Sequence, residues 1–187
     1  MHTTTNSAGP DFTQPIAALR HCHDRIRKEL RALTALPAHL SQHGANLEAQ
    51  QSAAAIVRYF DQAAPIHHAD EEEDLIPLLR ASARDADAAL LDLMIPVLTT
   101  EHRDMAAAWD TLQWQLKQIA LAQSAELDGE LAAQFSSLYA AHMDTEETHV
   151  ATMAKRLFDP AKMLLLGNAM RRRRGLPLAD DAVAAGA

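Results

Sequence analysis

The sequence has few of the residues on which sheets, tight turns and disulfide scaffolds depend. Its 187 residues include 6 glycines and a single cysteine, Cys22, and aromatic residues make up only 4%. One cysteine excludes an internal disulfide framework and suits a reducing compartment. Scarce glycine and aromatics among abundant Ala, Leu, Gln, Glu and Arg favour helices over strands. The composition therefore predicts an all-α protein, and the length suits one domain with a sizeable core.

Long apolar runs and an excess of positive charge are also missing. No apolar run reaches the roughly 20 residues that a membrane-spanning helix needs. The N-terminus lacks a basic segment followed by an apolar one, so no signal peptide is expected. The formal net charge of −8 gives no reason to expect nucleic acid as a partner. We therefore expect a cytoplasmic protein that binds neither membranes nor nucleic acid; no pattern specifies its oligomeric state.

Histidine, in contrast, is abundant, with 10 residues. Four histidines lie in the middle of apolar stripes that repeat every three or four residues, which is the spacing of one helix face. Helices of about 30 residues joined by short loops return each histidine to a similar height. The pattern predicts an up-down-up-down antiparallel four-helix bundle with one histidine at mid-height in each helix: His23, His67, His102 and His142.

Composition also suggests the limits of the folded part. Residues 1–10 are small and polar, and we expect a disordered leader there. The bundle is expected over residues 11–175, and residues 176–187 are expected to form a flexible tail. A short fifth helix should begin at Asp159-Pro160 and end at Arg171–Arg174. We interpret these arginines as an ordinary basic last turn, which favours the negative end of a helix dipole.

Two of the four histidines are followed by a glutamate four residues later. The pairs are His67 with Glu71 and His142 with Glu146. Positions i and i+4 lie one above the other on a helix, so each pair presents both side chains to one face. A buried glutamate without a partner costs several kcal/mol, and two of them require cations or protons.

The second helix can be drawn in two registers. One places His67 and Glu71 inward, and the other places His68 and Glu72 inward but also buries Asp61. Because the first register buries less charge, we choose it. The rest of the acidic run Asp70–Asp74 is then expected to be a solvated helix face, with Glu71 as the inward exception.

These side chains form a candidate site for two metal ions. A single histidine on an apolar helix face is usually a hydrogen-bonded core residue, but four centred on their stripes argue for a metal site. Imidazole and carboxylate ligands suit iron, manganese or zinc. Two octahedral ions offer about twelve positions, and the four histidines, two bridging glutamates and an oxo or hydroxo bridge leave roughly two open. The predicted metal ligands are His23, His67, Glu71, His102, His142 and Glu146.

In these motifs the sequence resembles the hemerythrin-like (HHE cation-binding) domain family from about His21 to Asp159. The resemblance implies an antiparallel four-helix bundle with two oxo- or hydroxo-bridged non-haem iron ions bridged by both glutamates, for which zinc or manganese can substitute. The order of His before Glu at i and i+4 distinguishes it from ferritin-like bundles, which use Glu-x-x-His. The motifs are His23-Asp24-Arg25-Ile26-Arg27, His67 to Pro77, Glu101-His102 and His142-Met143-Asp144-Thr145-Glu146-Glu147.

One position departs from the oxygen-carrying members of that family. They have a further iron-binding histidine four residues before the one that matches His102, and here that residue is Leu98. The departure argues against plain oxygen carriage; as replacement ligands, His68, Glu72 and His149 are disfavoured by their register. His149 could instead hydrogen-bond a ligand, although a core or rim position is the interpretation we prefer.

The resemblance therefore implies a protein that binds or senses oxygen, nitric oxide or redox state, more a metal-binding protein than a dedicated enzyme. An iron store or buffer and a redox enzyme for peroxide or nitric oxide are alternatives. A zinc-bound or metal-free interaction bundle is a third. No catalytic residue is assigned, because the sequence has no phosphate-binding loop, zinc-protease motif or nucleophilic triad.

Overall fold

The computed structural model describes residues 10–179, and every regular element in this part of the chain is helical. The all-α prediction is therefore confirmed. Most of the expected leader (residues 1–9) and of the expected tail (residues 180–187) lies outside the described residues. The helices are α1 (Pro15–His43), α2 (Leu47–Ala69), α3 (Ile76–Ser82), α4 (Asp85–Ala120), α5 (Gly129–Thr145), α6 (Ala151–Leu157) and α7 (Pro160–Arg173), with π-helical turns η1 (Asp70–Leu75) and η2 (Glu146–Val150).

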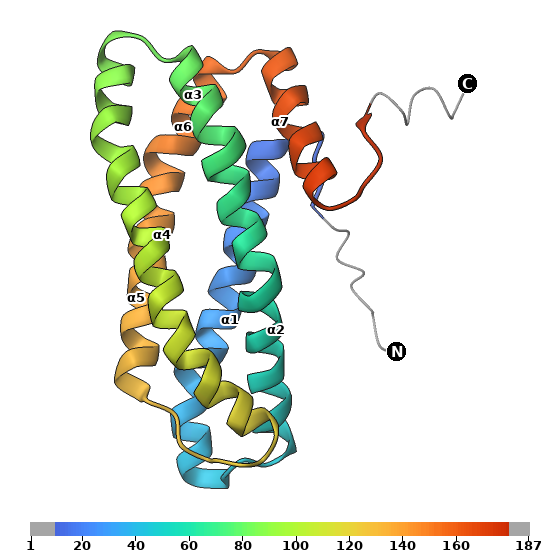
Figure 1. Cartoon of the computed structure of the whole chain (residues 1–187), viewed down its shortest axis with the longest axis vertical. Coiled ribbons are helices and arrows are strands. Elements are labelled where there is room, and N and C mark those ends of the chain that lie inside the picture. The colour runs from blue at the N-terminus through green and yellow to red at the C-terminus, as the bar shows by residue number, and fades with distance from the viewer. Residues whose placement is uncertain (1–9, 180–187) are drawn as a thin grey trace, which may run out of the picture.

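Four long rods make up the body of the molecule. Turn η1 and helix α3 continue α2, and turn η2 and helix α6 continue α5. Helices α1, α2, α4 and α5 form a ring in which each contacts the next and α5 contacts α1 (Figure 1). Helix α7 is the expected short fifth helix and packs on the side of the bundle, against α1 and η1.

The helix ends agree with local sequence signals. The Asn46 side chain accepts a hydrogen bond from the backbone N–H of Ala49, which caps the start of α2. Asp159 caps α7 in the same way, with Pro160 in the first turn, where its missing N–H leaves no bond unmade. Within the described residues no helix is both long and apolar enough to cross a membrane.

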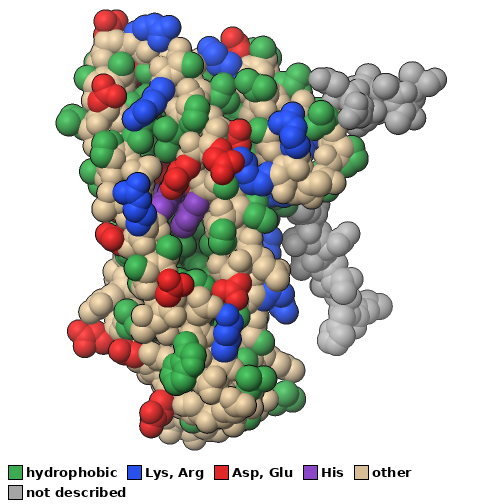
Figure 2. Space-filling model, in the orientation of Figure 1, with side chains coloured by type: hydrophobic (Ala, Val, Ile, Leu, Met, Phe, Trp, Pro, Cys, Tyr) green, Lys and Arg blue, Asp and Glu red, His purple; other side chains and the backbone are tan. Residues whose placement is uncertain are grey.

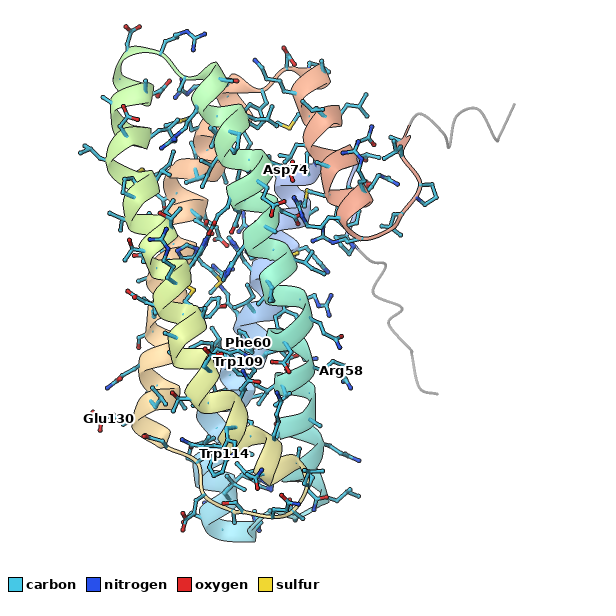
Figure 3. All side chains as sticks on the ribbon, viewed as in Figure 1. Arg58, Phe60, Asp74, Trp109, Trp114 and Glu130 are labelled. Carbon is cyan, nitrogen blue, oxygen red and sulfur yellow. The ribbon has the colours of Figure 1, made fainter. Side chains whose placement is uncertain are left out.

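The apolar core is divided into two clusters along the bundle. One is rich in aromatic side chains, and Figure 3 shows two of them, Phe60 and Trp109, meeting between α2 and α4, with ring centroids 5.0 Å apart. The other contains residues of the first turns of α1, of the N-terminal half of α4, and of α3, α6 and α7. In each of the four rods, the histidine or the His-Glu pair falls between residues of the two clusters. A buried polar layer therefore separates two apolar halves.

Both π-helical turns lie at this polar layer. Glu71 is in η1 and Glu146 begins η2. A π-helical turn inserts about one extra residue, which rotates the following helix face by roughly 100°. Val150 is accordingly buried where the α-helical stripe had placed His149, which is exposed. The stripe that the sequence predicts through His142 and Glu146 is therefore interrupted at His149, which lies at the surface and not in the core, and Met153 beyond it is buried again.

Candidate metal centre

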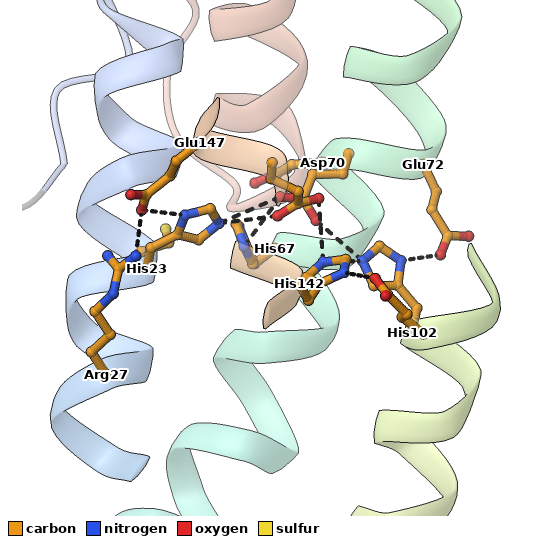
Figure 4. Close-up of polar contacts among 12 residues, drawn as sticks. His23, Arg27, His67, Asp70, Glu72, His102, His142 and Glu147 are labelled. Atoms are coloured by element: carbon orange, nitrogen blue, oxygen red, sulfur yellow. Dashed lines mark hydrogen bonds and ion pairs between the residues drawn. The ribbon is translucent and has the colours of Figure 1, made fainter. Parts of the chain in front are cut away.

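All six predicted metal ligands come together inside the bundle (Figure 4). Each is at most 5% exposed, although all six are polar. In residues 10–179 one other polar side chain is buried to this degree, that of Asp70. The six side chains come from six different elements on the four rods: His23 from α1, His67 and Glu71 from α2 and η1, His102 from α4, and His142 and Glu146 from α5 and η2.

The six residues form two overlapping groups of four. Within each group the nitrogen and oxygen atoms lie within 4.8 Å of one another. Both groups contain Glu71 and Glu146, so the two carboxylates are shared and the histidines are not. We call the group with His23 and His67 the first half, and the group with His102 and His142 the second half.

Each shared carboxylate presents one oxygen to each half. For Glu71, Oε1 lies 3.2 Å from Nε2 of His67, and Oε2 lies 3.6 Å from Nε2 of His102. For Glu146, Oε2 lies 3.3 Å from Nε2 of His23, and Oε1 lies 3.3 Å from Nε2 of His142. Ligands on neighbouring octahedral positions about 2.1 Å from one ion are about 3.0 Å apart, so this spacing suits two carboxylate-bridged ions.

Several polar atoms at the centre have no hydrogen-bond partner in the described part of the chain. They are Nε2 of His23, Oε2 of Glu71 and Oε2 of Glu146. A buried polar atom left without a partner costs about 1–3 kcal/mol. Two of these atoms, Nε2 of His23 and Oε2 of Glu146, face each other in the first half, and Oε2 of Glu71 faces His102 in the second half. Because the unpartnered atoms are nitrogen and oxygen, cations are the groups that fit beside them.

Outer carboxylates hold three of the four imidazole rings. A carboxylate accepts a hydrogen bond from Nδ1 and leaves Nε2 to face the centre, which fixes both the tautomer and the ring orientation. These orienting roles were not predicted from the sequence, although each of the three glutamates lies one residue from a predicted ligand. The pairs are His23 with Glu147 (2.9 Å), His102 with Glu72 (2.5 Å) and His142 with Glu101 (2.8 Å).

The choice of register on the second helix agrees with the positions of its side chains. His67 and Glu71 are 2% exposed and belong to the centre. His68 belongs to neither group, and its ring stacks on that of His102 with centroids 4.0 Å apart. Glu72 is exposed and reaches the centre only through His102. Figure 2 shows histidine side chains at the surface between acidic side chains, on the face that carries α2 and α4.

Burial lowers the pKa values of the buried histidines, and the nearby carboxylates raise them. Burial lowers the pKa of His23, but Glu146 and Glu71 outweigh it and raise this pKa to about 10. The pKa of His142 likewise rises to about 9, because Glu146 outweighs burial. His67 behaves differently: burial and the neighbouring His23 lower its pKa well below 6.5. In the metal-free protein, protons on His23 and His142 therefore balance part of the carboxylate charge.

The pKa values of the two shared carboxylates are also shifted in opposite directions. Burial and the charge of Glu146 raise the pKa of Glu71, whereas the histidines His142 and His23 hold the pKa of Glu146 well below 4.5 despite its burial. A metal ion replaces the protons on its ligands, so binding releases them.

A cavity of about 220 Å³ connects the first half with the outside. Its walls include Ile16, Leu19 and Val150, and it reaches His23 and both shared carboxylates, but neither His102 nor His142. A second cavity of about 170 Å³ lies on the other side and reaches His68, which stacks on His102. None of the six predicted ligands lines the second cavity. Of these two cavities, the first therefore gives a small molecule a direct path to His23 and the shared carboxylates.

Asp70 corrects the interpretation of the acidic run as solvated apart from Glu71. Its side chain is fully buried, because α7 folds back against η1 and places two arginines on it. Nη1 of Arg173 and Nη2 of Arg174 each donate to the Asp70 carboxylate over 2.6 Å. The basic end of α7 is thus more than a favourable last turn, as it neutralises a buried acid beside a predicted metal ligand.

Comparisons with known proteins agree with this geometry. A family model described as hemerythrin HHE cation binding domain matches residues 14–154, which include all six residues of the centre. An uncharacterized protein of Haemophilus influenzae is similar to the chain, with 31% identity over 136 residues, 73% of this chain and 76% of that protein. Helix α7 lies beyond the part matched by the family model. The chain belongs to the hemerythrin HHE cation-binding domain family.

Proposed function

We propose that the protein binds two non-haem iron ions in an up-down-up-down antiparallel bundle and uses them to bind or sense a small molecule such as oxygen or nitric oxide. The observation that carries the proposal is the sharing of Glu71 and Glu146 by two groups of four ligands. His23 and His67 would hold one ion, and His102 and His142 the other. Bound iron would supply open coordination positions and redox chemistry at the end of an apolar cavity.

The number of ligands supports a reactive centre over a structural one. Each half offers two imidazole nitrogens and two carboxylate oxygens, whereas an octahedral ion takes six ligands. Leu98 lies one turn before His102, is 1% exposed and has no atom that can bind a metal. Positions therefore remain for a bridging oxygen and for a small external ligand, and the cavity beside His23 would deliver that ligand.

Metal analysis and absorption spectroscopy test this function. Protein purified in the presence of iron should contain about two irons per chain and absorb in the near ultraviolet as oxo-bridged ferric iron does. His142→Ala should lower the iron content, whereas the matched variant His149→Ala, which removes an exposed histidine further along the same rod, should leave it unchanged. Stoichiometric zinc with no iron would contradict the iron assignment, and zinc or manganese would then be the native metal.

An iron buffer or a redox enzyme that acts on peroxide or nitric oxide is the second candidate. The open positions that four protein ligands leave on each ion favour it, because they permit turnover as well as binding. Exposure of the reduced protein to oxygen separates the two functions. A stable oxygenated species supports binding or sensing, and rapid irreversible oxidation supports redox chemistry.

A further inference from the structure

Helix α7 forms ion pairs with Asp70, the residue next to the predicted bridging ligand Glu71. Arg173 and Arg174 both donate to Asp70, and Arg173 also pairs with Glu73 and Asp74. Asp70 has no exposed surface, so water cannot replace these arginines where it lies now. Helix α7, which with its C-cap residue supplies both arginines, lies outside residues 14–154, which the family model matches.

The middle of helix α7 packs closely against the rest of the protein. A Cβ atom at Gly167 would lie 2.1 Å from the carbonyl oxygen of Phe12, so only glycine permits this approach. Leu166 and Met170 are fully buried in the apolar cluster on the same side of the metal centre. The Arg174 guanidinium also lies 4.9 Å from the centroid of the Phe12 ring. Both shape and charge therefore hold α7 in place.

Asp70 and Glu71 are consecutive residues of η1, a π-helical turn that interrupts the rod between α2 and α3 and packs against α7. If the two arginines were lost while α7 stayed docked, the Asp70 carboxylate would be a buried charge without a partner, and η1 would have to move to hydrate it. If α7 itself detached, Asp70 would lose both its cover and its partners, and η1 would lose the contacts that hold it in place. Such a movement displaces Glu71, which presents one oxygen to each half of the centre. The attachment of α7 is therefore expected to affect the ligand geometry of both halves of the centre.

We propose that the docking of α7 and the binding of metal are coupled through Asp70, with Arg173 and Arg174 as positioning residues for Glu71. The inference rests on the proposed metal-binding function. Coupling between two binding events is reciprocal, so metal that is held more tightly when α7 is docked must also hold α7 more tightly. The stability of α7 docking at the surface would then depend on whether metal occupies the buried centre.

The sign of the effect separates this coupling from simple electrostatics. In Arg173→Gln/Arg174→Gln two positive charges are lost near the centre, and Coulomb's law alone predicts tighter binding of a cation. Coupling predicts the opposite, with Fe²⁺ released to a chromogenic chelator about tenfold faster under anaerobic conditions, as for the loss of partners that orient ligands. The control Arg171→Gln/Arg172→Gln removes equal charge from the same turn; Arg172 is exposed, and Arg171 donates to the Pro177 carbonyl. The control should release Fe²⁺ as the unaltered protein does.

A second variant detaches α7 without changing any charge. Gly167→Val places a side chain against Phe12, and it too should release Fe²⁺ faster. Amide hydrogen exchange over residues 160–173 supplies the reciprocal measurement: Fe²⁺ should slow exchange there in the unaltered protein and not in Gly167→Val. Far-ultraviolet circular dichroism checks that the bundle remains folded.

Two outcomes overturn the inference, and they differ in what else they overturn. If either variant exposes the amides of α7 to exchange yet keeps Fe²⁺ as long as the unaltered protein, the coupling is absent and the metal-binding function stands. If the unaltered protein holds no Fe²⁺, the proposed function fails and the coupling fails with it.

Discussion

The two halves of the metal centre contain the same ligand types but differ in support and in access. In the second half, outer carboxylates orient both imidazoles, and the ring of His68 covers that of His102. In the first half only His23 has such a partner, while Nδ1 of His67 has none in the described residues. The cavity reaches His23 of the first half and the shared carboxylates, but neither histidine of the second half.

This difference suggests a division of labour between two otherwise similar groups. Outer carboxylates raise the affinity of a histidine for metal, and their loss typically costs 10–100-fold. In the proposed two-ion centre, the second half would therefore hold its ion more tightly than the first half. In the first half, His67 has no orienting carboxylate, and a cavity connects His23 with the surface. We therefore expect the external small molecule to bind at the first half.

The largest effect should follow from removing a ligand that the halves share. Glu71→Ala takes one oxygen from each half and leaves the facing imidazoles without their bridge, so we expect both ions to be lost. Glu72→Ala removes only the carboxylate behind His102 and should weaken the second half by about tenfold. Metal content after gel filtration measures both. Equal losses from the two variants would mean that Glu71 is not shared.

Removing one histidine from each half tests their independence. His67→Ala should leave about one ion per chain, held in the second half, because binding of each ion depends on its own deprotonated ligands. His142→Ala takes away a better supported ligand and should also leave about one ion, held more weakly in the first half. Metal analysis during titration with a chelator compares them. If the ion left in His142→Ala is the more resistant one, the proposed difference in retention is wrong.

Filling the cavity should slow ligand access without removing metal. Ala151 lines the cavity at the first half, and Ala151→Leu would narrow it. We expect azide or nitric oxide to bind several-fold more slowly in stopped-flow absorption, with unchanged iron content. Ala106→Leu adds the same volume to the cavity beside His68 and is the matched control. Slower binding in the control would place the entrance at the second half.

The smallest effect is a release of protons on metal binding. With pKa values of about 10 and 9, His23 and His142 carry protons at pH 7.5, one in each half. Glu71, whose pKa is raised to about 8 by burial and the charge of Glu146, also holds a proton in most molecules at this pH. All three ligands must lose their protons to bind metal, so about two to three protons should be released, and metal affinity should rise with pH until these groups deprotonate. Calorimetry in buffers of different ionisation enthalpy measures the release. A binding heat that does not depend on the buffer would contradict these protonation states.

Much of this site could be foreseen because it depends on helical spacing. The histidine intervals and the His-Glu pairs placed all six side chains on inward faces, and the charge of Asp61 decided the register of the second helix. Asp61 does lie at the surface, where it accepts a hydrogen bond from the indole N–H of Trp109. Local patterns were sufficient where one helix alone determines which side chains face inward.

The predictions from the sequence were wrong where a distant segment or an irregular backbone determines whether a side chain is buried. Asp70 is buried because Arg173 and Arg174 approach it from a helix about a hundred residues away, which no local pattern reveals. The exposure of His149 follows from the π-helical turn at Glu146, and the sequence has no spacing signal for such a turn. The roles of Glu101 and Glu147 also require the neighbouring helix to be in place.

The division of the core by a polar layer has a consequence for how the protein loses its structure. Without metal, each end of the bundle has its own apolar cluster, and the layer between them contributes charged groups in place of hydrophobic contacts. Segments with separate cores tend to open as separate cooperative units. Metal ions bound to residues from all four rods would join the ends, so filling the centre should turn two units into one.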